Sequence, residues 1–331
     1  MIYWVSTKNE GSGLFHYSQK LFSKLDFKDI KWIEAEEVKD FKEFPIIYNL
    51  GNHPMNSQIY RYAFEYPGYI LLHDLNLHHS ALPQKREEYF EVKDKVYKIR
   101  EAGVWIDNLE LYSPAIYNLL NRQKGIFVHS RYAQEILKMW NIKTPSFYIP
   151  MGTETFKENF EKIPFSLGIF GHRGINRKLK ETAKIILKIK EEIKDLKVII
   201  CGGGTKEGLE DLNFAEFYEN LPSKEFYDLL SRVQIIFNFR YPVYGETSLS
   251  TLEAMARGTV PLVSSYGSYK ELEGVVHLNK IEEGYFKIKK LFECPLYLNQ
   301  LSIQARKFVE KYHSIEIWVE RWKEILCGLK K

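Results

Sequence analysis

Two glutamates and a run of hydroxyl side chains stand together in the stretch YGETSLSTLE, residues 244–253. Glu246 and Glu253 are seven residues apart, so in a helix they would share one face. Gly245 and Gly258 predict where that helix begins and ends. The first turn of this helix would offer unpaired N–H groups to a phosphate or a sugar. The alternative is that Glu246 only caps the helix and Glu253 is only solvated. The other residues expected to contact such a ligand are Thr247, Ser248 and Leu249.

A second group of chemically capable residues is basic. The sequence GHRGINRK, residues 171–178, follows an apolar, strand-like run and precedes a lysine-rich helical one. Arg173 and Lys178 are separated by four residues across this turn, so both can reach one anion, Arg as a planar fork and Lys as a point charge. Without a metal site, such a pair is expected to balance a leaving diphosphate. The alternative is an exposed basic loop that binds nothing.

Two glycine clusters follow predicted strands. Gly11-Ser12-Gly13 follows the first strand of the chain, and a glycine triplet centred on Gly203 follows a later one. Neither completes the GxGxxG dinucleotide fingerprint, because His16 and Glu207 stand where the third glycine belongs. We expect both clusters to let a diphosphate or nucleotide approach the backbone, with plain tight turns as the alternative.

His73 and Asp74 end a predicted strand, which is where parallel α/β folds gather ligand groups. We expect His73 to be functional, with Asp74 beside it as a substrate contact. His78 and His79 follow at a spacing that suggests a metal, but no further ligand is evident, so no metal site is predicted. The sequence also has no GxSxG, HExxH or Asp-x-Asp motif.

Composition indicates a globular chain. Its 331 residues, 45% hydrophobic and 27% charged, suffice for two domains. The net charge is +4, and the first 155 residues hold 19 basic against 19 acidic side chains, so the excess lies in the second half. That suits an anionic ligand there and is too weak to predict nucleic-acid binding. Three cysteines without a CxxC pair favour the cytoplasm, and we expect no signal peptide or membrane span.

Strand-like and helical runs alternate along the chain, which predicts an α/β protein with parallel sheets wound with helices on both faces. The proline-bounded segment 145–164 predicts the domain boundary. We therefore expect one domain over 1–155, a second over 156–313, and a terminal amphipathic helix over 314–331 that packs on the first. The expected strands are Ile2–Val5, Pro45–Leu50, Tyr69–Leu72, Gly125–His129, Leu167–Phe170, Lys197–Cys201, Gln234–Asn238, Val260–Ser264 and Val275–Leu278.

The basic turn and the YGETSLSTLE stretch resemble the diphosphate loop and donor-binding segment of glycosyltransferase family 4, whose members are retaining, GT-B-type enzymes. The resemblance extends over most of the chain, through residues 47–79 and the sequences GIFVHSRYAQEIL, FYIPMGTE and IICGGGTKEGLEDL. Two departures stand out. The family usually has glycine directly before the arginine, where His172 intervenes here, and its commoner first glutamate falls at Gly245 rather than at Glu246.

The resemblance implies two Rossmann-like domains facing across a cleft, with the acceptor mainly on the first and the sugar nucleotide mainly on the second. It also implies roles for individual residues. Arg173 and Lys178 would hold the diphosphate and Glu253 the ribose hydroxyls. The Gly11-Ser12-Gly13 loop would approach the donor, and His73 would touch the transferred sugar.

The expected activity is retaining transfer of a hexose from a UDP- or GDP-sugar to a glycan, glycolipid or other hydroxyl acceptor, as in polysaccharide biosynthesis. No cofactor or metal is expected. The leaving diphosphate would take the acceptor's proton, while a nucleophilic Glu246 is the competing mechanism. The alternatives are a sugar-nucleotide epimerase or hydrolase, and a non-catalytic sugar-nucleotide-binding protein. Most of the aromatic rings of the first half are expected in the core, but a few of them on the surface beside Lys20 and Lys24 would make peripheral contact with the inner membrane surface and bind a lipid-linked acceptor. The rings concerned are Phe15, Tyr17, Phe22, Trp32, Tyr60, Tyr62, Phe64 and Tyr66.

Overall fold

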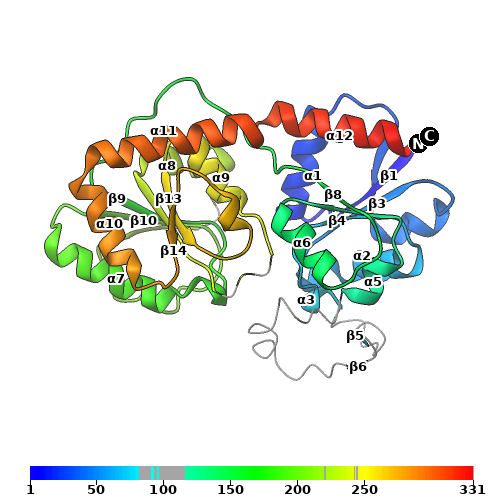
Figure 1. Cartoon of the computed structure of the whole chain (residues 1–331), viewed down its shortest axis with the longest axis horizontal. Helices are drawn as coiled ribbons and strands as arrows, with labels where there is room; N and C mark the ends of the chain where they lie inside the picture. The colour runs from blue at the N-terminus through cyan, green and yellow to red at the C-terminus, as the bar shows by residue number, and fades with distance from the viewer. Residues whose placement is uncertain are drawn as a thin grey trace. The chain divides into compact units, whose positions relative to one another are not determined.

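The computed structural model describes residues 1–81, 91–92, 95–96, 116–219, 221–241, 243 and 245–330. The chain divides into two compact units, each built on its own sheet (Figure 1). The first unit comprises Met1–Met151, Tyr244–Thr247 and Glu316–Lys331. The second comprises Gly152–Val243 and Ser248–Ile315. The chain passes from the first unit to the second within the segment 145–164 that the prolines single out.

The first sheet has six parallel strands in the order β2-β1-β3-β4-β7-β8. Its strands are β1 (Ile2–Val5), β2 (Ile30–Ile33), β3 (Ile46–Leu50), β4 (Tyr69–Leu72), β7 (Gly125–Val128) and β8 (Ser146–Tyr148). A separate antiparallel pair joins β5 (Glu91–Val92) to β6 (Lys95–Val96).

The second sheet also has six parallel strands, in the order β11-β10-β9-β12-β13-β14. Its strands are β9 (Ser166–Phe170), β10 (Lys197–Cys201), β11 (Glu216–Tyr218), β12 (Ile235–Asn238), β13 (Val260–Ser264) and β14 (Val276–Leu278).

Helices connect the strands of both sheets, as right-handed crossovers between parallel strands require. Those of the first unit are α1 (Gly13–Lys24), η1 (Ala35–Asp40), η2 (Pro54–Asn56), α2 (Ser57–Glu65), α3 (His78–Ala81), α5 (Tyr117–Asn121), α6 (Arg131–Met139) and α12 (Ile315–Leu329). Those of the second unit are η5 (Ile175–Arg177), α7 (Leu179–Glu192), α8 (Ser223–Arg232), α9 (Leu249–Ala256), η6 (Gly267–Glu271), α10 (Glu283–Glu293) and α11 (Pro295–Tyr312).

The predicted fold class, two Rossmann-like α/β domains, is confirmed. The nine strands expected from the sequence all form, but β2, β8 and β11 of the two large sheets, and the short strands β5 and β6, were not expected. The first three each lie at the edge of their sheet and have at most one fully buried residue. These three edge strands lack the continuous apolar run of a strand covered on both faces, so the pattern that reveals central strands does not reveal them. The fourth edge strand, β14, keeps two buried apolar residues and was expected.

The strand orders predict where each unit binds a ligand. In an open α/β sheet, ligands bind beyond the carboxyl ends of the strands, where the direction of winding reverses. In the first sheet this reversal lies between β1 and β3, and in the second it lies between β9 and β12. The loops that follow these four strands are therefore the places to look for a site.

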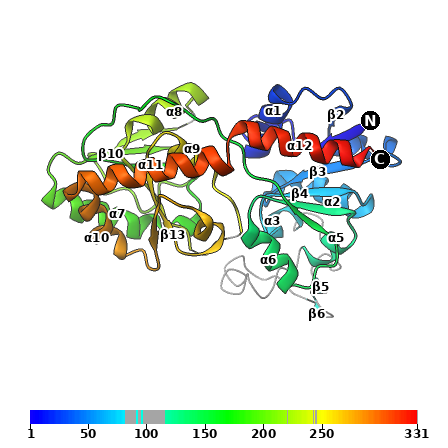
Figure 2. The ribbon, with the colours of Figure 1, turned by 45° about the horizontal axis from the view of Figure 1, so that its top comes forward.

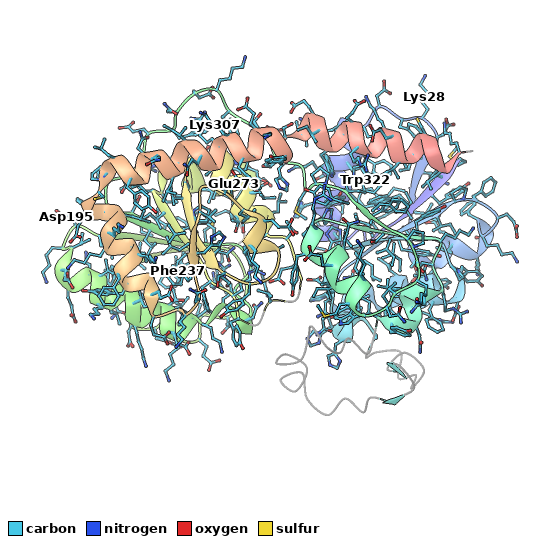
Figure 3. All side chains as sticks on the ribbon, viewed as in Figure 1. Lys28, Asp195, Phe237, Glu273, Lys307 and Trp322 are labelled. Atoms are coloured by element: carbon cyan, nitrogen blue, oxygen red, sulfur yellow. The ribbon has the colours of Figure 1, made fainter. Side chains whose placement is uncertain are left out.

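The C-terminal helix α12 packs on the first unit, beside α1 (Figure 2). Trp318 and Trp322 are fully buried, and both indole N–H groups donate to the hydroxyl of Tyr17 on α1, at 2.9 and 3.1 Å. Trp322 (Figure 3) also packs edge-on against Trp4 of β1, with ring centres 5.2 Å apart. One buried hydroxyl thus joins the last helix of the chain to the first.

We expect Tyr17→Phe to destabilise the first unit by about 2 kcal/mol or more, because two buried indole N–H groups lose their acceptor. Urea denaturation followed by tryptophan fluorescence measures this. Tyr297→Phe, on the exposed surface of α11, is the matched control and should unfold like the wild type. Equal stability of Tyr17→Phe and wild type would show that the two indoles do not depend on Tyr17.

Candidate functional site

The glycine triplet after β10 forms a turn that is closed by the loop after β9. Gly202 and Gly204 have φ angles of +132° and +104°, which side chains rarely adopt. A Cβ on Gly202 would lie 2.4 Å from the carbonyl oxygen of Gly171, and one on Gly204 would lie 2.7 Å from that of Arg173. Gly203 differs, because a Cβ there would meet no atom within 4 Å. The predicted ligand-contact residue is therefore the open position of this turn.

Arg173 holds this turn from inside. Its side chain is fully buried, and its guanidinium donates to the carbonyl oxygens of Gly202, Gly204 and Thr205. It also pairs with the Glu219 carboxylate at 2.9 Å. Five N–H groups in a rigid fork suit such a role. In this arrangement Arg173 fixes the shape of the turn, and a diphosphate would have to replace some of these partners, so its predicted role as a ligand remains a prediction.

Lys178 is exposed to solvent in part and sits directly before α7 in the left-handed conformation, with φ 50° and ψ 50°. That conformation costs a residue with a side chain about 1 kcal/mol, and such strain is concentrated at functional sites. Lys178 also lines a hollow of about 630 Å³ between the start of α7 and residues 205–211. Its ammonium lies 6.0 Å from the centre of the Tyr241 ring, whereas Arg173 points into the glycine turn.

Two further arginines make this edge of the second sheet electropositive. Arg177 is buried and donates to the carbonyl oxygens of Phe170 and His172. Burial, reinforced by the nearby charges of Arg240 and Arg173, lowers the pKa of Arg177 to about 9. Arg240 directly follows the residue after β12, beside the switch point. Neither arginine was among the site residues expected from the sequence, although the place of Arg240, two positions beyond the expected strand Gln234–Asn238, was a usable signal.

The YGETSLSTLE stretch is only partly helical. The N-cap of α9 is Ser248, whose hydroxyl is bonded to the Asn238 amide at 3.1 Å, and the helix itself begins at Leu249. Glu246 therefore lies before the helix, so the prediction that Glu246 and Glu253 share a helix face is wrong. The reason is Gly245, whose φ of +77° and close packing on Leu75 bend the chain where the sequence suggested a helix start. Tyr244 lies outside the described residues.

The remaining predicted residues of this stretch fall in both units. Glu246 and Thr247 group with the first unit, whereas Ser248, Leu249 and Glu253 belong to the second. At the other end of α9, Gly258 has a φ of +71° and ends the helix as expected.

Glu253 is buried in α9 and already engaged. Its carboxylate accepts a hydrogen bond of 2.8 Å from the Tyr227 hydroxyl. Burial and the Glu253 charge raise the pKa of Tyr227 above its usual range, so this hydroxyl keeps its proton. Arg257 lies over the Tyr227 ring, with its guanidinium carbon 4.5 Å from the ring centre. Ribose hydroxyls bound at Glu253 would share the carboxylate with Tyr227.

In the first unit, His73 follows β4 and contacts two rings from distant parts of the sequence, which its position in the sequence did not predict. Its ring centre lies 4.8 Å from that of His129, at the end of β7, and 5.0 Å from that of Tyr17. Its Nε2 lies 2.6 Å from Oδ1 of Asn49, a buried residue of β3. Burial and the neighbouring His129 hold the pKa of His73 well below its ordinary value, so the imidazole is neutral at pH 7.

The other predicted residues of the first unit shape its loops. Asp74 accepts a hydrogen bond of 2.8 Å from the backbone N–H of Asn52, so it supports the turn after β3. Ser12 caps α1 by accepting from the N–H of Leu14. Gly13 has open space around the position of a Cβ. The Gly11-Ser12-Gly13 loop follows β1 and the Asn52 turn follows β3, so both lie at the switch point of this sheet.

The side chains proposed for membrane contact are mostly packed. Tyr17, Tyr60 and Phe64 are buried, and five further rings of that set are half-buried: Phe15, Phe22, Trp32, Tyr62 and Tyr66. No helix of the described residues is long and apolar enough to cross a membrane. Within the same residues, no group of three His, Cys, Asp or Glu side chains is arranged to hold a metal ion.

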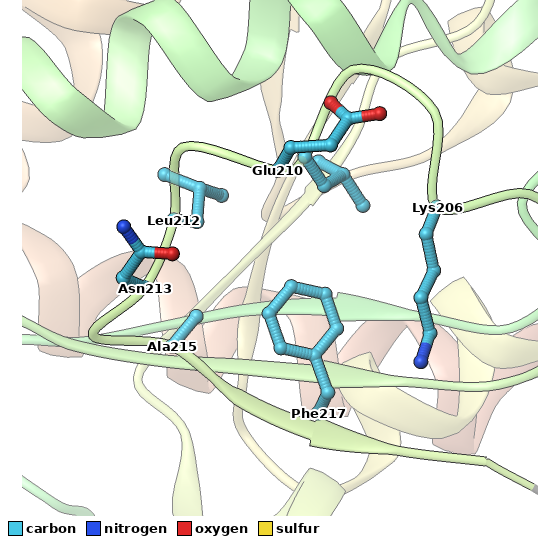
Figure 4. Close-up of a pocket in the computed structure, with 7 residues that line it drawn as sticks. Lys206, Glu210, Leu212, Asn213, Ala215 and Phe217 are labelled. Carbon is cyan, nitrogen blue, oxygen red and sulfur yellow. The ribbon is translucent and has the colours of Figure 1, made fainter.

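A smaller hollow of about 380 Å³ lies beside the edge strand β11 (Figure 4). Its apolar floor includes Leu212 and Phe217, and Lys206 and Glu210 stand at its rim. None of the residues predicted to bind the ligand lines it, so we do not assign it to the site.

Solved structures with this architecture include several glycosyltransferases. HepE from Anabaena, in a complex with UDP-glucose, matches with a TM-score of 0.69 and 13% identity over 99% of both chains. Sucrose-phosphate synthase from Thermosynechococcus elongatus matches with a TM-score of 0.68 and 13% identity over 99% of this chain and 98% of its own. A glycosyltransferase from Rickettsia africae matches with a TM-score of 0.58 and 15% identity over 100% and 98%.

No protein-family model matches the sequence, and no curated protein matches it either. The structural matches are low in identity and nearly complete in length, so they bear on the fold. The chain has a GT-B-type fold. Membership of family 4 remains a prediction.

The glycine turn gives a stability test. We expect Gly202→Ala and Gly204→Ala to destabilise the second unit by several kcal/mol, because each Cβ would meet backbone atoms at a strained φ. Gly203→Ala should change stability by less than about 1 kcal/mol, since its Cβ meets no protein atom. Denaturant titration of the three variants measures the difference. Similar losses in all three would contradict the open position assigned to Gly203.

Proposed function

We propose that the protein is a retaining glycosyltransferase that moves a sugar from a nucleoside-diphosphate sugar to a hydroxyl group of a glycan or lipid-linked acceptor, without a metal ion. HepE was solved with UDP-glucose, and its fold matches this chain almost end to end. We propose that this protein likewise uses a nucleoside-diphosphate sugar as its donor.

The observation that carries the proposal is the convergence of three loops at the switch point of the second sheet. The loop after β9 pairs with the glycine turn after β10 through the N–H of Arg173 and the carbonyl of Gly203, at 2.9 Å. The same loop reaches the segment after β12, where the N–H of Tyr241 bonds the carbonyl of Asn176. A Cβ on Gly171 would lie 3.2 Å from the Ser250 hydroxyl at the start of α9.

These loops combine what a sugar diphosphate needs. The turn offers open backbone at Gly203, α9 offers its N-terminal N–H groups, and Lys178 with Arg240 adds positive charge. Glu253, in the second turn of the same helix, supplies a buried carboxylate for ribose hydroxyls. Metal-free positive charge of this kind stabilises a leaving diphosphate.

The reaction we propose is front-face transfer. The bond between the sugar anomeric carbon and the diphosphate oxygen breaks, and a bond to the acceptor oxygen forms on the same face of the sugar. The acceptor's proton passes to the departing diphosphate oxygen, so no protein nucleophile is required. Lys178 stabilises the charge on that oxygen, and Arg173 keeps the glycine turn in shape.

His73 would contact the transferred sugar as a neutral imidazole. The competing mechanism through Glu246 predicts a covalent glycosyl-enzyme, which mass spectrometry of the protein with donor alone would detect. Product analysis with donor alone also separates transfer from the epimerase or hydrolase alternative, since those reactions need no acceptor.

We further propose a cytoplasmic location. Cosedimentation with anionic liposomes tests the peripheral membrane contact.

Replacing Lys178 should separate catalysis from stability. We expect Lys178→Gly to lower kcat/KM by about 10²- to 10³-fold, because diphosphate charge is left uncompensated. Its stability should stay within about 1 kcal/mol of wild type, since glycine accepts the left-handed conformation. The measurements are turnover with UDP- and GDP-sugars and thermal stabilisation by the same donors.

Two matched variants complete this test. Lys180→Ala removes a lysine that lines the same hollow and should keep near wild-type turnover. Arg173→Ala should lose about 3–5 kcal/mol of stability together with activity, because it leaves the turn carbonyls and Glu219 without their buried partner. Near wild-type turnover of Lys178→Gly with a verified donor would refute the diphosphate assignment.

Activity should persist in excess EDTA, because the proposed charge stabilisation comes from lysine and arginine side chains. The rate is measured with and without chelator, and with Mg²⁺ or Mn²⁺ restored. Loss of activity in EDTA that either cation reverses would overturn metal independence and leave the fold assignment unaffected.

A further inference from the structure

A buried polar network surrounds Asn49 in the middle of the first sheet. Its amide nitrogen contacts the Ser6 hydroxyl at 3.0 Å, the Ser18 hydroxyl at 3.1 Å and the Leu14 carbonyl oxygen at 3.1 Å. Ser18 also accepts a hydrogen bond from the Trp4 indole. Asn49, Ser6 and Ser18 are each at most 1% exposed, so water does not compete for these bonds. The network joins β1, α1 and β3.

This network fixes which way the Asn49 amide points. The Leu14 carbonyl oxygen only accepts hydrogen bonds, so the amide nitrogen must face it. The amide oxygen of Asn49 is then the atom that faces His73, 2.6 Å from Nε2. An amide oxygen only accepts, so Nε2 of His73 must carry the proton and donate. The other ring nitrogen, Nδ1, is left with a lone pair because the imidazole is neutral.

The neighbouring ring has the opposite arrangement. His129 places Nδ1 3.0 Å from the carbonyl oxygen of Ile149, which requires the proton on Nδ1. Two imidazoles 4.8 Å apart are therefore held in different tautomers by two acceptors of the protein. Tyr17 packs against both rings, and its hydroxyl is the acceptor of the α12 indoles.

We propose that Asn49 is a positioning residue that locks His73 as the Nε2–H tautomer, so that His73 meets its ligand through Nδ1 as a hydrogen-bond acceptor. The ligand group is then a hydroxyl that donates, as on a sugar. This deepens the proposed function, on which the identity of the ligand rests. The tautomer itself depends only on the protein.

The tautomer is measured directly by long-range ¹H–¹⁵N correlation NMR of protein labelled with ¹⁵N-histidine. The His73 signals are identified by their loss in His73→Gln. We expect a protonated Nε2 and a bare Nδ1 at pH 7, without ligand. A protonated Nδ1, or an imidazolium, would overturn the proposal whether or not the protein transfers sugar.

The role of Asn49 is tested by Asn49→Asp, which replaces the amide by a carboxylate that favours the imidazolium. The titratable groups facing His73 are Tyr17 on α1 and His129 after β7, with Asp74 next to it in the chain. We expect kcat/KM of Asn49→Asp to fall about tenfold between pH 8.5 and pH 6.5, relative to wild type, because Nδ1 then gains a proton and cannot accept.

Asn121→Asp places a carboxylate elsewhere in the same unit and should leave the pH profile unchanged. A flat profile for Asn49→Asp, with His73 shown by NMR to be protonated, would overturn acceptance through Nδ1. If Asn49→Asp does not fold, the wild-type NMR measurement decides the proposal by itself. Failure of the proposed function would appear separately, as absence of transfer by the wild type.

Discussion

Parallel pairing of the strands in each six-stranded sheet is the constraint on which each unit's site depends. In both six-stranded sheets every described strand pair is parallel, so the carboxyl ends of all six strands lie along one edge. Loops far apart in the sequence then meet there. For this reason three segments converge at the β9/β12 switch point of the second unit: the loop 171–178, the turn 202–204 and the start of α9. In the first unit the side chains that meet in the same way are Asn49, Tyr17, His73 and His129.

At the carboxyl edge of each sheet, several polar side chains hold the protein's own loops in place and are not available to a ligand. Arg173 and Arg177 use their guanidinium groups on carbonyl oxygens of their own unit. Asn49 uses its amide nitrogen on buried partners and its amide oxygen on the ring of His73. These bonds leave a few positions open, chiefly Gly203, Lys178 and one nitrogen of His73. A binding site needs both kinds of group, because the supporting side chains hold the exposed ones in a single geometry toward the ligand.

Sequence patterns predicted the central strands and the residues that gather at their ends. Apolar runs such as VIIC of β10 and VPLVS of β13 are buried on both faces, and that burial is visible in composition alone. The same reasoning missed β2, β8 and β11, which are edge strands, and misplaced the start of α9. A glycine at 245 suggested a helix start, whereas packing against Leu75 made it a bend.

The sequence by itself determined the alternation of strands and helices, the two-domain division and the presence of basic, glycine-rich and hydroxyl-rich loops, because each follows from local periodicity and residue type. Only the tertiary structure decided which groups remain available. Arg173 and Lys178 look equivalent in the sequence, yet one is buried against the glycine turn and the other stands strained beside a hollow. Likewise, the proton on His73 is placed by Asn49, 24 residues away in the chain, because hydrogen-bond partners are set by spatial neighbours rather than by sequence.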